Sequence, residues 1–445
     1  MKILRPHRML LLGISLPCVV TILFTACYYP KATKPLQVSP PTFSIAGPSM
    51  APTFQGPGWD VQCSSCRHQW RQFVFLGGDM SPGDDAPKRQ PCPNCGTIWD
   101  VDKIRFNAKR VSTAVRWDAR PKADFQRGDV IVLADEASQG MPRVKRILGV
   151  PGDTIDAHPL PSDHVAAGHV LQLVINGQSP LKRIPPSKRP WVHVYRDSTP
   201  DSRFKGERWT QRKQSRNTGP EDATPRIWTG SLGDWLMYSH FQFRGEHAAA
   251  SPIMDDYAGN LNVSRPLVPA AHVRVSLHLD KSAFRHVTGL RIQMAFCDAE
   301  GTRSLFEREI RKESHNVQID TLESLKIESD QDSALQQCPI DRQHPIAIRI
   351  LPQRKKQTAT SEPTDQIIAI SNLCVQRGVR YWVDAETAAA WPNPLCIEDG
   401  CVFVLGDNVP VSIDDRQRVA AGAKGTPVSH LYQGPEVWRH QLRGG

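Results

Sequence analysis

The chain has 445 residues, a length that ordinary domain sizes divide into two or three units, and this excludes a single minimal domain. Its formal net charge is +10, and basic side chains are spread over polar runs such as 211–216 and 354–356. Such runs are typical of a solvated face, with attraction to anionic lipid headgroups as the alternative.

The first thirty residues have the pattern of a membrane anchor. Residues 1–8 are basic, and residues 9–29 carry no charge and are mostly apolar. About 20 apolar residues let a helix cross a bilayer, and a short basic head favours a cytoplasmic N-terminus. We therefore expect an uncleaved anchor with the rest of the chain outside. A cleaved secretory signal is one alternative, and a lipoprotein signal ending at Cys27 is another.

Ser49 and Lys145 have the complementary chemistry of an acyl-transfer dyad. Ser49 lies among turn formers, and Lys145 lies in the apolar stretch 144–148, which ends at a Pro-Gly-Asp turn. A serine hydroxyl needs a base to take its proton, and lysine can serve only when it is neutral. Its pKa must then fall by roughly three units from about 10.4, which apolar burial can supply. The alternative is an ordinary turn and a surface lysine.

Four cysteines form two CxxC knuckles, Cys63 with Cys66 and Cys92 with Cys95. A tryptophan follows the first cysteine of each knuckle at the same distance, which predicts two similar hairpins around one metal ion. The pattern resembles a zinc ribbon, in which four thiolates surround a structural zinc and leave no position for water. Two disulfides are the alternative in an oxidising compartment, although tight CxxC turns make poor structural disulfides.

Short runs with period-two alternation of apolar residues fill much of the segment 187–391. They cover residues 235–238, 273–279, 290–296 and 347–350. Many short alternating strands predict an antiparallel β-sandwich, while residues 307–312 fit either a strand edge or a helical turn. Such sandwiches resemble carbohydrate-binding modules. A carbohydrate or protein ligand and a spacing role therefore both stay open.

Four short blocks follow one another in a fixed order. They are Ser-Met-Ala-Pro-Thr from Ser49, Arg-Gly-Asp-Val-Ile from Arg127, Lys-Arg-Ile-Leu-Gly-Val-Pro-Gly-Asp from Lys145, and Gly-Asp-Asn from Gly406 with Ser-Ile-Asp-Asp-Arg from Ser412. In this order they resemble the conserved boxes of the bacterial type I signal peptidase (leader peptidase) family, which uses a Ser-Lys dyad. The resemblance leaves the cysteine-rich and strand-rich insertions outside it.

The resemblance assigns roles to five residues. It implies that Ser49 is the nucleophile and Lys145 the general base. It also implies that Ser412 orients the lysine amine and that Asp414 and Arg416 form a supporting ion pair. For the last three residues, a polar turn that closes a sheet is the alternative.

Two positions depart from the pattern of many family members. Gly47 stands where some members have a serine that donates to the oxyanion, so the oxyanion hole would rest on backbone N–H groups, chiefly that of Ser49. Residues 409–411 read Val-Pro-Val where many members have Arg-Asp-Asn, which removes charge beside the site.

We therefore expect a mainly β chain with a coiled antiparallel catalytic core of the signal peptidase type after one transmembrane helix. Expected core strands lie at 43–49, 129–134, 143–148, 170–176 and 402–405. The expected order is a cytoplasmic head and anchor (1–30), core (31–57), zinc-ribbon-like insertion (58–104), core (105–186), sandwich-like insertion (187–391) and core (392–445).

The resemblance implies a membrane-anchored serine endopeptidase that removes signal peptides from exported preproteins and needs no cofactor for catalysis. It would lie in the bacterial inner membrane as a single-pass protein, with its catalytic domain on the external side. Its partners would be preproteins and the lipid bilayer, and nucleic acid is not an expected partner of an external protein. The alternatives are a related Ser-Lys processing peptidase with a specialised substrate and a catalytically degenerate binding protein.

Overall fold

The fold is that of a computed structural model. The residues described are 42–45, 47–56, 58–73, 89–100, 109–111, 113–121, 124–133, 142–160, 169–197, 208–211, 227–244, 247–257, 267–284, 287, 289–327, 335, 338, 340–353, 367–392, 394–427 and 431–438. The expected anchor over residues 1–30 lies outside these ranges. Within them, no helix has both the length and the apolar character needed to cross a bilayer.

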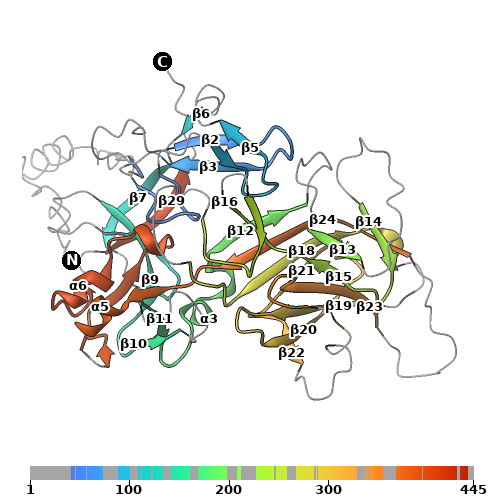
Figure 1. Ribbon diagram of the computed structural model, residues 1–445. Coiled ribbons are helices and arrows are strands. Elements are labelled where there is room, and N and C mark those ends of the chain that lie inside the picture. The colour runs from blue at the N-terminus through green and yellow to red at the C-terminus, as the bar shows by residue number, and fades with distance from the viewer. Residues whose placement is uncertain are drawn as a thin grey trace, which may run out of the picture. The chain divides into compact units, whose positions relative to one another are not determined.

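The chain is mainly β, as predicted, and one of its sheets is curled and seven-stranded. In spatial order its strands are β1 (Thr42–Ser44), β7 (Ala114–Pro121), β29 (Leu431–Trp438), β8 (Val130–Leu133), β9 (Arg143–Gly149), β27 (Cys401–Leu405) and β28 (Thr426–Pro427). The C-terminal strand β29 lies between the N-terminal strands β7 and β8 in this sheet (Figure 1). The strand expected at 43–49 ends at Ser44, because Gly47 and Pro48 begin a series of turns.

Apolar side chains cover both faces of the central strands β8 and β9. Val132 packs with Val144 and with Met50, the residue after Ser49, on one face. Ile131 packs with Ile147 on the other face. Lys145 is the register partner of Ile131, so the lysine stem enters an apolar environment.

A second, four-stranded sheet packs against the segment around Leu405 and Val409. Its order is β25 (Trp382–Asp384), β11 (Val170–Ile175), β10 (Thr154–Pro159) and β26 (Leu395–Cys396). The short helices of this part of the chain are α3 (Pro180–Arg183), η2 (Pro186–Lys188), α5 (Ala385–Ala389), η5 (Val409–Val411) and α6 (Asp415–Ala420). Helix α6 begins with a capping box in which Asp414 and Gln417 satisfy each other's backbone N–H groups.

The cysteine-rich segment forms small antiparallel strands. The first knuckle lies between β2 (Gly58–Gln62) and β3 (Gln69–Phe73), and β2 also pairs with β6 (Lys109–Val111). The second knuckle lies between β4 (Arg89–Pro91) and β5 (Ile98–Asp100). Each knuckle turns through a residue with positive φ, Arg67 or Gly96.

Two antiparallel sheets and a hairpin occupy residues 191–378; we call the two sheets together the sandwich. The first sheet contains β12 (Trp191–Arg196), β24 (Ile367–Gly378), β18 (Val273–Leu279) and β21 (Asn316–Asp320), with β14 (Ile227–Ser231) also on β24. The second contains β13 (Trp209–Gln211), β15 (Leu236–Tyr238), β23 (Ile346–Pro352), β19 (Leu290–Cys297), β20 (Arg303–Ile310) and β22 (Leu325–Ile327). The hairpin is β16 (Phe241–Arg244) with β17 (His247–Ala250), and a short helix η3 (Lys281–Phe284) follows β18.

Side chains from both sheets of the sandwich share one buried core. Val275 of β18 and Ile292 of β19 are fully buried in it, with Trp209 and Tyr238 among the largest members. The alternating burial of β18 follows the period-two pattern of its sequence. Residues 307–310, for which the sequence left two readings open, belong to strand β20.

Candidate active site

Lys145 is buried on β9, and its amine contacts the fourth sequence block, which comprises Gly406–Asn408 and Ser412–Arg416. The side chain is 3 % exposed, and its Nζ donates a hydrogen bond of 2.6 Å to Ser412 Oγ. Burial lowers the pKa of Lys145 to about 8, an effect that the negative charge of Asp414 partly offsets. A substantial fraction of this lysine is therefore neutral near pH 8, the state in which an amine can accept a proton.

The turn around Ser49 is held by the Gly-Asp-Asn turn. Asn408 N donates to the carbonyl oxygen of Ser49 at 3.0 Å. A Cβ on Gly406 would lie 2.2 Å from Ser412 Oγ and 2.4 Å from Ser49 O, so only glycine fits at this position. Gly406 thus separates the Ser49 backbone from the hydroxyl that receives the Lys145 hydrogen bond. The structure brings Ser49, Ser412 and Lys145, which are far apart in sequence, to one place.

Asp414 and Arg416 form a buried ion pair with two hydrogen bonds. Arg416 Nε lies 2.8 Å from Asp414 Oδ1, and Arg416 Nη2 lies 3.1 Å from Oδ2. The guanidinium also donates to the carbonyl oxygens of Val409 and Ser412, and Gly406 N donates to the Asp414 carboxylate. The pair therefore fixes the backbone on both sides of the Ser412 hydroxyl.

A second buried ion pair, Arg146 with Asp407, was not anticipated from the sequence. Arg146 Nε and Nη2 donate to the two carboxylate oxygens of Asp407 at 2.8 and 2.7 Å, a bidentate contact. The remaining donors reach Thr53 Oγ1 at 3.1 Å and the carbonyl oxygens of Gly128 and Lys188 at 2.8 and 2.7 Å. All five guanidinium N–H groups therefore have acceptors.

The same carboxylate also receives two hydroxyl groups. Tyr381 donates to Asp407 Oδ1 at 2.8 Å, and Thr53 donates to Oδ2. Burial, together with the nearby carboxylate, raises the pKa of Tyr381 well above its ordinary value, so the phenol stays protonated. All four sequence blocks meet at this network, because Thr53, Gly128, Arg146 and Asp407 come from one block each.

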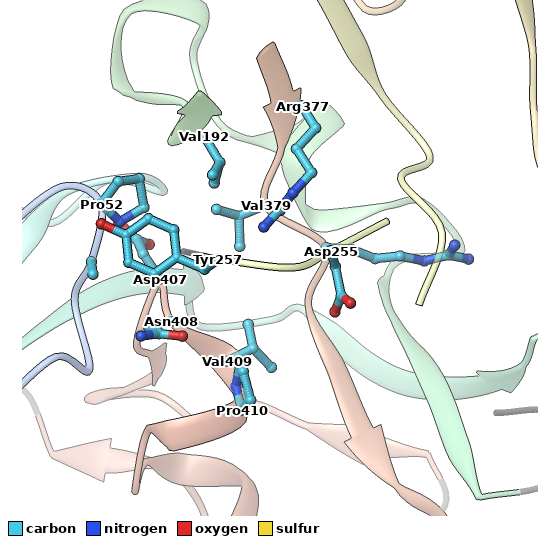
Figure 2. A pocket seen from close by; sticks show the side chains of 12 residues that line it. Pro52, Val192, Asp255, Tyr257, Arg377, Val379, Asp407, Asn408, Val409 and Pro410 are labelled. Carbon is cyan, nitrogen blue, oxygen red and sulfur yellow. The ribbon is translucent and has the colours of Figure 1, made fainter. Parts of the chain in front are cut away.

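The Val409–Val411 segment forms the short helix η5, and a small cavity lies beside it. Val409 is buried, and the residues that line the cavity of about 20 Å³ include Pro52, Asp255, Tyr257, Asn408 and Pro410 (Figure 2). This volume matches about one water molecule. The space lies beside Pro52, three residues after Ser49.

The four knuckle cysteines converge on one point. All four are buried thiols, and their sulfur atoms lie within 4.8 Å of one another. The Sγ atoms of Cys63 and Cys95 are 3.6 Å apart, and those of Cys66 and Cys92 are 3.7 Å apart. A tetrahedral ion with bonds of about 2.3 Å to sulfur requires separations of about 3.8 Å. The cluster can therefore bind a structural metal ion, and its separations are much longer than a disulfide bond.

Comparison with known proteins supports one family. Residues 39–183 match the family model described as "Signal peptidase, peptidase S26". The match covers about a third of the chain and includes the positions of Ser49 and Lys145, but it ends before Ser412. No curated protein and no solved structure gives a significant match to the chain. A signal peptidase domain is therefore present, and it supports serine peptidase activity of this general kind.

Sequence reasoning missed Arg146 and Tyr381 because the available signal was weak. Arg146 stands directly beside the predicted base, and alternation along a strand places its side chain on the opposite face. An arginine in an otherwise apolar run is a sign of a buried partner, because an unpaired buried charge is very costly. Tyr381 carried no comparable sign, since it lies outside all four blocks.

The Arg146–Asp407 pair generates a stability prediction. In Asp407→Asn the shape is kept but the buried guanidinium loses its counter-charge, so we expect a loss of about 3–5 kcal/mol in the free energy of unfolding. Equilibrium urea unfolding measures this change. Glu398→Gln is the matched control because it removes the partner of the exposed Lys424, and it should leave the midpoint unchanged. Equal stability of the two variants would show that the network is not needed for the fold.

Proposed function

We propose that the protein is a serine endopeptidase that removes N-terminal signal peptides from exported preproteins, with Ser49 as nucleophile and Lys145 as general base. The observation that carries this proposal is the buried amine of Lys145, whose pKa is lowered to about 8 and which bonds to Ser412 beside the Ser49 turn. A surface lysine with its ordinary pKa of about 10.4 would be charged near neutral pH and could not act as a base.

In the acylation step, Ser49 Oγ attacks the carbonyl carbon of the scissile peptide bond while neutral Lys145 takes the hydroxyl proton. Ser412 Oγ accepts an N–H of the amine. In the proposed mechanism the nitrogen lone pair, which points away from Ser412, faces Ser49 Oγ. Backbone N–H groups, chiefly that of Ser49, stabilise the oxyanion. The ammonium group of Lys145 then protonates the leaving amine as the C–N bond breaks.

Hydrolysis of the acyl-enzyme reuses the same base. After the mature protein leaves with its new N-terminus, Lys145 is neutral again and takes a proton from an incoming water molecule. The resulting hydroxide attacks the ester carbon, and the proton returns to Ser49 Oγ as the signal peptide is released. Asp414 and Arg416 serve as positioning residues, because they hold the backbone that presents the Ser412 hydroxyl.

The location and anchoring of the protein are part of the same proposal. The uncharged, apolar stretch 9–29 would span the bacterial inner membrane once and leave the catalytic domain on the external side. A preprotein is held in that membrane by its own signal sequence, so an anchored protease and its cleavage site would meet at the bilayer surface. The lipid bilayer and preproteins are the partners that this arrangement requires.

We further propose that the metal held by Cys63, Cys66, Cys92 and Cys95 is zinc. Thiolate ligands in a tetrahedral arrangement suit zinc, and a four-thiolate site leaves no open position for catalytic water. Zinc would thus stabilise the fold of the knuckles, while catalysis would rest on side chains alone. No step of the peptidase reaction passes through the metal.

A cleavage assay tests the dyad. Ser49→Ala and Lys145→Met should each lower kcat/KM for a preprotein with an Ala-X-Ala site by about a thousandfold or more, because either change removes nucleophile or base. Lys424→Met, which changes an exposed lysine, should cleave at the parent rate. Equal cleavage by all four proteins would end the dyad assignment, and a parent that cleaves no preprotein would favour an anchored binding protein.

The pH dependence tests the role of Lys145 separately. Only neutral Lys145 accepts a proton, so kcat/KM should rise with pH through about 8 and then level off. Asp414 raises the pKa of Lys145, so Asp414→Asn should move the rising limb to lower pH. Asp156→Asn, which changes a carboxylate in the middle of β10 that pairs with His158, should leave the limb in place. A limb that stays or moves upward in Asp414→Asn would contradict the assignment of Lys145 as the titrating base.

Metal analysis tests the cysteine cluster. The purified parent should contain about one zinc ion per chain, and Cys92→Ser should lose it because a four-thiolate site needs all four ligands. Elemental analysis by mass spectrometry measures the content. Cys396→Ser, which replaces an exposed cysteine outside the cluster, is the control. Unchanged zinc in Cys92→Ser would refute the site.

A further inference from the structure

The second cysteine knuckle covers the edge of a strand in the sandwich. Strand β12 lies at one end of its sheet, and among the described strands only β24 pairs with it. The side chain of Asn94, between Cys92 and Cys95, binds the other edge of β12. Its Oδ1 accepts from Arg196 N at 2.8 Å and its Nδ2 donates to Arg196 O at 2.9 Å. The amide therefore takes the place of a neighbouring strand at this residue.

The same amide also touches the metal-binding cluster. Asn94 is 1 % exposed, and its Nδ2 lies 3.6 Å from Cys66 Sγ. Groups that donate to metal-bound sulfur orient the ligands of a metal site and are oriented by them. Asn94 thus links a cluster sulfur directly to the backbone of the sandwich.

Two further contacts join the knuckles to the same region. His68, which follows the first knuckle, stacks on His193 of β12 with ring centroids 4.5 Å apart. A Cβ on Gly96 would lie 2.3 Å from the ring of Phe243 on β16, so the second knuckle packs directly against that hairpin. Both knuckles therefore contact residues of the segment 191–250.

The cysteine-rich segment also contacts the chain that follows the block beginning at Ser49. Arg71 of β3 pairs with Asp60, and its Nη1 donates to the carbonyl oxygens of Gln55 and Gly56. These carbonyls lie only a few residues after Ser49. The cysteine-rich segment thus contacts both the chain after Ser49 and the edge strand β12 of the sandwich.

We propose that the metal-loaded cysteine cluster fixes the sandwich to the peptidase core through the side chain of Asn94, which contacts both the cluster and strand β12. We call this link the clasp. A metal ion would hold Cys66 and the second knuckle in the geometry that points the Asn94 amide at Arg196. Loss of the ion would release that amide and expose the edge of β12. This inference rests on the proposed metal site and not on the proposed peptidase activity.

Amide hydrogen exchange on the full chain tests the clasp, because the Arg196 N–H donates to Asn94. Asn94→Ala should keep the metal content of the parent but exchange the Arg196 amide about five- to tenfold faster, the effect of losing one hydrogen bond of about 1 kcal/mol. Chelation of the parent should accelerate the same amide at least as much. Chelation of Asn94→Ala should add little, because the link is already broken.

Asn316→Ala is the matched control. It changes an asparagine on β21, the strand at the opposite edge of the same sheet, and it should leave the Arg196 amide unaffected. The proposal is overturned if chelation changes exchange in the knuckles but not at Arg196, or if Asn94→Ala exchanges like the parent. A parent without metal would also overturn it, while the cleavage assay would still decide the peptidase assignment.

Discussion

The buried ion pair between Arg146 and Asp407 is the contact on which the arrangement of the catalytic region depends. A guanidinium with 3 % exposure is tolerable only if each of its donors finds an acceptor, and here the acceptors come from four separate segments. Thr53, Gly128 and Asp407 must therefore occupy their places together. That requirement brings the Ser49 turn and the Ser412 turn to β9, although Lys145 makes no contribution to it.

Arg146 and Lys145, the two buried basic residues of β9, differ in whether they can lose their charge. Arg146 is fully paired with a carboxylate and keeps its charge at any pH that the fold survives. Lys145 is buried beside a neutral hydroxyl, with Asp414 acting on it from a distance, and its charge is easily lost. Burial alone would destabilise the charged form of both side chains. The difference in partners makes one a permanent structural charge and the other a group that can exchange a proton.

Local patterns in the sequence predicted local structure well. Alternation identified β18 and most of β19 and β23, because each has one face toward a shared core. Strand β7 went unnoticed, since its polar residues and its proline interrupt the alternation. The sequence blocks predicted that Ser49, Lys145 and Ser412 belong to one site. The Arg146 network joins residues up to 354 positions apart, and no local pattern carries such information.

Side chains alternate between the two faces of β9, so the register of this strand with β8 and β27 decides which residue faces Ser412 and which faces Asp407. A slip of this strand by one residue would move each side chain to the opposite face. A slip in one direction would place the Arg146 guanidinium, which does not release its proton, at Ser412, and a slip in the other direction would place the Lys145 amine, with three donors, where the five-donor guanidinium stands at Asp407. A one-residue slip of β9 would therefore end the proposed proton transfer while leaving every functional side chain present.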